Sequence, residues 1–156
     1  MFLALDSEKY EDAEKWADYL IKKDSSTAQN WVYYANSKWA NEHRAEAAKA
    51  YAKALKLDKN NTEALFQLSS LIGTEKPVAA LAMLEKFKQL RPDDSYEADY
   101  RIAIIYNENR NLRKTEEYLR KAVKANPYHL PSWYALAELY EIKGDNKSAV
   151  RTINQL

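Results

Sequence analysis

The amino-acid sequence predicts an all-α fold, an α-solenoid built from antiparallel helix–turn–helix repeats. Two observations lead to this prediction. Equivalent residues recur every 34 positions along the 156-residue chain, and periods of this length are typical of stacked helical hairpins. The chain also has only two glycines and four prolines, a composition that favours long uninterrupted helices.

The 34-residue period is visible at several positions of each repeat. One series opens the repeats and consists of Trp31, Leu65, Asp99 and Trp133. A second series, four residues later, is small in every repeat and would let two helix backbones approach closely; its members are Ala35, Ser69, Ala103 and Ala137. A third series marks the second half of the repeats, at Ala13, Ala47, Thr115 and Ala149. The repeats close on Asn, Asp or Pro, which favour turns.

These series place the elements in order. We expect helices over residues 7–22, 28–41, 44–57, 62–73, 77–90, 96–109, 112–125, 130–143 and 146–156. Pro77 suits the first turn of its helix. The repeats then span 28–61, 62–95, 96–129 and 130–156, the last one truncated, after a partial repeat over 1–27. In that partial repeat, Met1 to Leu5 would end one helix and 7–22 would form the next.

The expected ends lack a polar capping helix, which solenoids usually need for solubility. The last helix stops at Leu156, where a packing residue of the repeat should lie. We therefore expect the chain to be a piece of a longer protein, or its ends to be covered by a partner.

Composition argues against several classes of function. A formal charge of +1 gives no general attraction for nucleic acid or anionic membrane. The chain has no cysteine, two glycines cannot build a phosphate loop, and no apolar run approaches the ~20 residues of a membrane helix. His43 and His129 are the only histidines, and we expect both to be exposed turn residues. We predict no catalytic site, metal or cofactor in a soluble protein, cytoplasmic rather than periplasmic.

The repeat closest to a known pattern contains Trp133, Leu136, Ala137, Tyr140 and Ala149, with Gly144-Asp145 between its helices. It resembles the tetratricopeptide repeat, and the resemblance extends over nearly the whole chain. Two departures are Asp99, which stands where the family has an aromatic residue, and Lys59, which replaces the closing proline. The resemblance implies a right-handed solenoid whose first helices line a concave groove, and a function in binding other proteins. It also implies that Trp31, Trp133, Tyr106 and Tyr140 belong to the core.

The inward positions of the first helices follow from the same resemblance. The expected peptide-binding residues are Tyr33, Asn36, Phe66, Gln67, Tyr100, Arg101, Tyr134 and Glu138. Phe66, Tyr100 and Tyr134 are 34 residues apart and predict an aromatic ladder along the groove, since aromatic rings are enriched at binding hot spots. The alternative is that these rings fill space between neighbouring repeats.

The expected groove leans acidic, with Glu63, Glu97, Glu138 and Glu141 against Arg101. Some members of the family clamp a terminal carboxylate with two lysines and further polar residues. The matching positions here are Val32, Asn36, Gln67, Glu97 and Arg101, so both lysines are missing and one site has the wrong charge. We therefore expect a peptide or helix with apolar anchors and some Lys or Arg.

Two other functions stay open on the sequence alone: a homo-oligomer formed through the end repeats, and a non-catalytic regulatory domain of a larger enzyme. A basic cluster also needs an interpretation; it comprises Arg110, Arg113, Lys114, Arg120, Lys121 and Lys124. Ion pairs with Glu116 and Glu117 favour a solvated outer face. The alternative is an anionic partner on the convex side.

Overall fold

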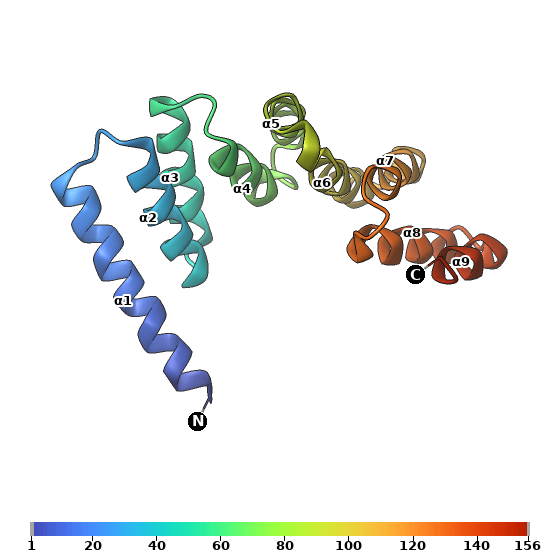
Figure 1. Ribbon diagram of the computed structural model, residues 1–156, viewed down its shortest axis with the longest axis horizontal. Helices are drawn as coiled ribbons and strands as arrows, with labels where there is room; N and C mark the ends of the chain where they lie inside the picture. Colours follow the sequence, from blue (N-terminus) through green and yellow to red (C-terminus); the bar gives the residue numbers. More distant parts are fainter. Residues whose placement is uncertain (1, 156) are drawn as a thin grey trace. The chain divides into compact units, whose positions relative to one another are not determined.

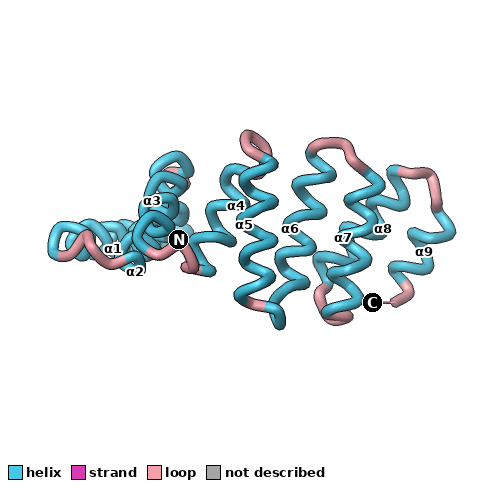
Figure 2. The backbone as a smooth tube through the Cα atoms, turned by 90° about the horizontal axis from the view of Figure 1, so that it is seen from above, coloured by secondary structure: helices cyan, strands magenta, loops and turns pink. Residues whose placement is uncertain are grey.

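The computed structural model describes residues 2–155, with side chains from residue 12 onward. These residues form helices and loops without a strand, and the predicted all-α fold of helix–turn–helix repeats is confirmed (Figures 1 and 2). The elements are α1 (Phe2–Lys23), α2 (Ala28–Ala40), α3 (Arg44–Leu57), α4 (Thr62–Ile72), α5 (Pro77–Leu90), the 3-10 turn η1 (Pro92–Asp94), α6 (Ser95–Glu108), α7 (Leu112–Ala125), α8 (Leu130–Ile142) and α9 (Asn146–Ile153).

The chain divides into two compact units, Met1–Ile72 and Gly73–Leu156. Unit 1 contains α1 to α4, and each of its helices packs against the next one along the chain. Unit 2 contains α5 to α9, which pack in the same sequential way. The boundary lies inside the expected repeat 62–95, so that this repeat gives α4 to unit 1 and α5 to unit 2.

Small residues let the helices of each unit pack closely. The small series of the repeat is buried throughout, at Ala35, Ser69, Ala103 and Ala137. In unit 1, Tyr51 of α3 is buried, and its hydroxyl donates a hydrogen bond to Asn36 of α2. In unit 2 the core cluster is formed by Leu119, Leu136, Leu139 and Tyr140 around Ala103 and Ala149. Burial of this apolar surface holds each stack together.

A left-handed residue ends the first helix of three hairpins. Glu42, Arg110 and Gly144 have φ values of 62°, 57° and 73°, and their positions differ by multiples of the repeat. The next backbone N–H donates to a carbonyl five residues earlier at 2.8 Å in every case, from His43 to Lys38, from Asn111 to Tyr106 and from Asp145 to Tyr140. This is the Schellman arrangement, which satisfies the last carbonyls of a helix.

The N-terminal segment differs from our expectation. The sequence suggested one helix ending near Leu5 and another beginning at residue 7, but Phe2–Lys23 is a single helix. Residues 1–27 contain no Gly or Pro to break the backbone pattern. Met1 and Leu156, which belonged to the expected ends, lie outside the described residues.

Candidate functional site

The predicted groove residues of unit 1 lie on α2 and α4. Tyr33 is 51% exposed, whereas Phe66 and Gln67 are half-buried. Asn36 is held in a network: its Nδ2 donates to Glu63 Oε1 at 2.7 Å, and its Oδ1 accepts a hydrogen bond from the Tyr51 hydroxyl. Burial, and next the charge of Glu63, raise the pKa of Tyr51 to about 12. Asn36 therefore positions the exposed Glu63 carboxylate.

The predicted groove residues of unit 2 lie on α6 and α8. Tyr134 is 59% exposed, and Glu138 and Ile142 follow it at intervals of four residues, so that the three share one side of α8. Tyr100 and Arg101 on α6 are half-buried. Tyr100 packs against the core cluster of this unit, so its ring fills space between helices while the ring of Tyr134 is free to contact a ligand.

A narrow cleft of about 40 Å³ lies between α6 and α8, with α7 as its floor. Ile104 and Asn107 of α6 face Glu138 and Ile142 of α8 across it, and Ala135 and Leu139 lie deeper. Its size suits one small apolar side chain. Asn107 and Ile142 were not among the expected groove residues, although Ile142 lies one helical turn from Glu138.

The glutamates of the expected groove in unit 2 lie on α6 and α8. Glu138 and Glu141 are exposed, and the half-buried Glu97 accepts a hydrogen bond from the Tyr96 hydroxyl at 3.3 Å. The described side chains contain no cluster of three or more metal-ligating groups. None of the described helices combines the length and apolar character needed to cross a bilayer.

His129 differs from its predicted state as an exposed turn residue. Its ring lies edge-on between Tyr96 and Tyr100, with centroid distances of 5.2 and 5.3 Å, and its Nδ1 is 2.6 Å from the buried Ser132 Oγ. Burial lowers the pKa of His129. Both tyrosines lie on α6, about 30 residues earlier in the chain, so no local sequence pattern predicts the contact. His43, in contrast, is exposed as predicted.

Two of the aromatic residues that we expected in the core lie at its edge, and Trp133 packs against the core cluster of unit 2. Trp31 and Trp133 are half-buried, and the indole N–H of each donates at 2.8 Å to a backbone carbonyl six residues earlier, Ser25 and Pro127 respectively. Each indole therefore closes the turn before its helix and keeps part of its ring at the surface. Tyr140 is buried as expected, and the half-buried Tyr106 stacks on Tyr118 at 5.6 Å.

Comparison with known proteins identifies the repeat. Residues 96–129 and 130–156 match the family model described as tetratricopeptide repeat. No curated protein sequence matches the chain.

Solved structures share the fold at low sequence identity. MamA 41-end from Desulfovibrio magneticus RS-1 has a TM-score of 0.84 at 21% identity, over 97% of this chain and 85% of that chain. YrrB, described as a TPR protein with an unusual peptide-binding site, has a TM-score of 0.73 at 21% identity, over 98% of this chain and 79% of that chain. PilW, a type IV pilus biogenesis factor, has a TM-score of 0.84 at 17% identity, over 99% of this chain and 71% of that chain.

Proposed function

We propose that this chain, whose residues 96–129 and 130–156 match the tetratricopeptide repeat family model, is a protein–protein interaction module that binds an extended peptide or helix of a partner. The observation that supports this most directly is the exposed face of α8, where Glu138 and Ile142 line the cleft toward α6 and the exposed Tyr134 lies one helical turn before Glu138. Exposed aromatic and aliphatic side chains beside a cleft are typical of binding surfaces. The face that contains Tyr33, Phe66 and Gln67 would serve the same purpose in unit 1.

The charge of these faces selects the partner. Glu63 in unit 1 and Glu97, Glu138 and Glu141 in unit 2 favour a segment with Lys or Arg between its apolar anchors. A terminal carboxylate fits poorly. Val32 stands at a clamp position but is fully buried, and the amide of Asn36 is already bonded to Glu63 and Tyr51.

A peptide titration tests the proposal. The probes are a fluorescein-labelled nonapeptide with Leu anchors and alternating Lys, and the same peptide with Glu in place of Lys. We expect the basic peptide to bind more tightly, and Tyr134→Ala to weaken it about tenfold, as hot-spot truncations do. Glu138→Lys should weaken the binding of the basic peptide and strengthen the binding of the acidic one.

Tyr128→Ala is the matched control, because Tyr128 lies in a loop of the same unit, is 91% exposed and belongs to neither α6 nor α8. Tyr134 is preferable to a triple replacement with Phe66 and Tyr100, since Tyr100 also packs against the core. Tighter binding of the acidic peptide, or an equal loss in Tyr128→Ala, would contradict the proposal.

Self-association is a second candidate function, favoured by exposed apolar side chains on two terminal helices. Trp16 and Tyr19 are exposed on α1, as are Val150 and Ile153 on α9. Sedimentation velocity over a range of concentrations would show whether the chain associates. If it does, Trp16→Ser and Val150→Ser should shift it toward monomer, whereas Val78→Ser, at an exposed position of α5, should not.

A further inference from the structure

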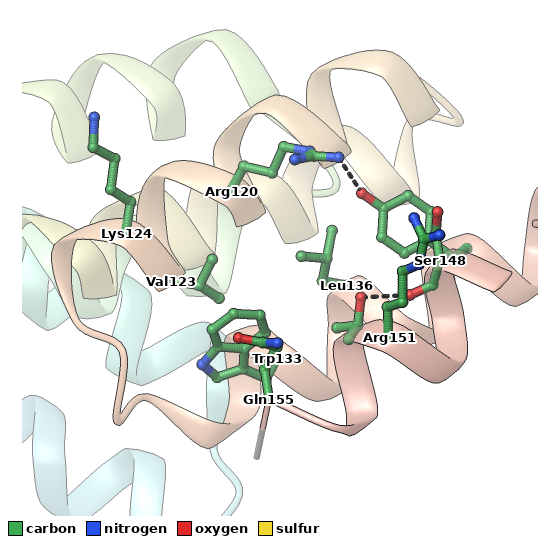
Figure 3. Close-up of a pocket in the computed structure, with 10 residues that line it drawn as sticks. Arg120, Val123, Lys124, Trp133, Leu136, Ser148, Arg151 and Gln155 are labelled. Atoms are coloured by element: carbon green, nitrogen blue, oxygen red, sulfur yellow. Dashed lines mark hydrogen bonds between the residues drawn. The ribbon is translucent and has the colours of Figure 1, made fainter.

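The two units each contain a pocket at the same position of the repeat. The larger one, of about 480 Å³, is lined by α7, α8 and α9 (Figure 3). The other, of about 410 Å³, is lined by α2 and α3. Trp133 and Trp31 occupy equivalent sites in them, three repeats apart, and so do Arg151 and Lys49. A feature that recurs at the repeat period is a product of the repeat and not of one irregular loop.

The pocket of unit 2 has an apolar wall. Val123, Trp133 and Leu136 line one side of it, and Figure 3 shows Val123 and Leu136 beside the Trp133 ring. The indole N–H already donates to Pro127 O, so the wall offers the ring and no free donor. A volume of this size lies in the range of ligand-binding pockets and can hold a large aliphatic or aromatic side chain.

The rim of the same pocket is cationic. Arg120, Lys124 and Arg151 line it, and no carboxylate does. Arg120 is engaged, because its Nε lies 3.0 Å from Glu116 Oε1 and its guanidinium donates to the Tyr140 hydroxyl at 2.6 Å. Lys124 and Arg151 have no carboxylate within ion-pair distance among residues 12–155. Their charges are therefore available to an anionic ligand.

The pocket lies on the opposite side of α8 from the cleft described above. Trp133, Leu136 and Tyr140 line the pocket, whereas Ala135, Glu138 and Ile142 line the cleft. One side of α8 therefore borders a cleft that includes the Glu138 carboxylate, and the other borders a pocket whose cations come from α7 and α9.

We propose that the pocket between α7, α8 and α9 is a second docking site, which takes an acidic peptide segment with one large apolar side chain. The apolar side chain packs against Trp133 and Leu136, and neighbouring Asp or Glu side chains pair with Lys124 and Arg151. Charge complementarity selects the acidic segment, since both available charges on the rim are positive. The equivalent pocket of unit 1 is less suited, because it includes Glu46 beside Lys49 and Lys53.

The test uses three labelled heptapeptides: six Asp and Glu residues around a central Phe, the same peptide with Ser for Phe, and the Phe peptide with Asn and Gln for the acids. We expect the acidic Phe peptide to bind most tightly in fluorescence anisotropy at low salt. Its binding should shift the indole N–H resonance of Trp133 in a ¹H–¹⁵N spectrum, assigned with Trp133→Phe.

A matched pair of charge reversals locates the site. Lys124→Glu with Arg151→Glu should weaken binding of the acidic Phe peptide about tenfold or more, the effect of losing two exposed ion pairs and adding repulsion. Arg113→Glu with Lys147→Glu changes the net charge equally on the same two helices, at exposed positions outside the pocket, and should leave most of the affinity. Tyr134→Ala should have no effect, which separates this site from the cleft of α8.

Four results would overturn the proposal: no binding to the wild-type chain, equal losses in the two double variants, equal affinity of the Phe and Ser peptides, or tighter binding of a single-stranded DNA of equal charge. Circular dichroism shows whether each variant is folded. Concentration-dependent association of the wild type, lost in Lys124→Glu with Arg151→Glu alone, would identify a second copy as the occupant and also overturn it.

Discussion

The Nζ of Lys88 lies 2.6 Å from a carboxylate oxygen of Asp99, where other repeats carry Trp31, Leu65 or Trp133. Asp99 is buried on α6, and Lys88 reaches it from α5. Burial raises the pKa of the Asp99 carboxyl, and the hydrogen bond from Lys88 acts in the opposite direction. The departure from the family pattern thus replaces an apolar contact with an ion pair between consecutive helices.

Removing one partner of this ion pair should lower the free energy of unfolding more than removing both partners. Lys88→Met leaves the Asp99 carboxylate buried without its hydrogen-bonded cation, and we expect a loss of about 3 kcal/mol in the free energy of unfolding. Lys88→Met with Asp99→Leu should recover most of it, because a buried pair can be replaced by apolar residues at little cost. Urea denaturation measures both, with the exposed Lys147→Met as control. A double variant less stable than Lys88→Met would contradict this account.

The left-handed turn residues predict stabilising substitutions. Glu42 and Arg110 have positive φ without being glycine, a conformation that costs roughly 1–2 kcal/mol for most residues. Glu42→Gly and Arg110→Gly should each stabilise the chain by about 0.5 kcal/mol, after the larger entropy loss of glycine on folding is subtracted.

Gly144→Ala is the reverse substitution at the equivalent turn position, and we expect it to destabilise the chain. A Cβ at Gly144 would meet no atom within 4 Å, so its cost of about 1 kcal/mol would come from the backbone alone. Shifts in the urea midpoint at constant slope measure all three variants. Destabilisation by both glycine substitutions would show that the Glu42 and Arg110 side chains contribute more than the strain costs.

His129 predicts a loss of stability in mild acid. Its folded-state pKa is lowered, so the unfolded chain binds the proton more readily than the folded chain does. The contribution of this residue is therefore complete above the unfolded pKa near 6.5 and is lost as the pH falls from there toward the lower folded pKa. The midpoint of thermal unfolding should drop over this interval in the wild type and less in His129→Gln. A ¹H–¹⁵N titration of the imidazole, with the exposed His43 in the same spectrum, checks the direction of the shift.

The attachment of α1 to the rest of unit 1 depends on a buried lysine. Lys38 on α2 is buried and forms ion pairs with Glu14 of α1 and, at 3.4 Å, with Glu46 of α3. Glu14→Gln should weaken the docking of α1 by about 1 kcal/mol, seen as faster amide exchange in that helix. Asp12→Asn removes an exposed ion pair with Lys15 on the same helix and should change exchange very little. Equal effects of the two variants would contradict this role of Lys38.

The sequence predicted the helices well, because the signal for each is local and is repeated along the chain. Helical periodicity, Pro77 and the turn residues placed α2 to α8 within a few positions of their observed bounds. The error at α1 has the same origin, since the repeat register suggested a break where the local residues contain no breaker. Trp31 and Trp133 were assigned to the core by the family pattern, but their indole N–H groups bind turn carbonyls at the surface.

The site was less accessible to sequence reasoning, because it depends on contacts between helices. Residue type and register were sufficient to identify Tyr134 and Glu138 as candidates. They could not show that Asn36 is occupied by Glu63 and Tyr51, or that His129 lies between two tyrosine rings. The basic residues illustrate the same point: Arg120 and Lys121 form ion pairs on α7, as expected of a solvated face, whereas Lys124 lines a pocket.

The distance between the two sides of α8 also determines how long a linker a bivalent ligand would need. A helix with its side chains is about 10 Å across, so a chain that passes around its end from one side to the other needs a connection of only a few extended residues. One flexible segment could therefore present a lysine-rich motif and an aspartate-rich motif to the same helix, and its second contact would form at high effective concentration. Lengthening that connection would lower the avidity while leaving the affinity of each motif alone unchanged.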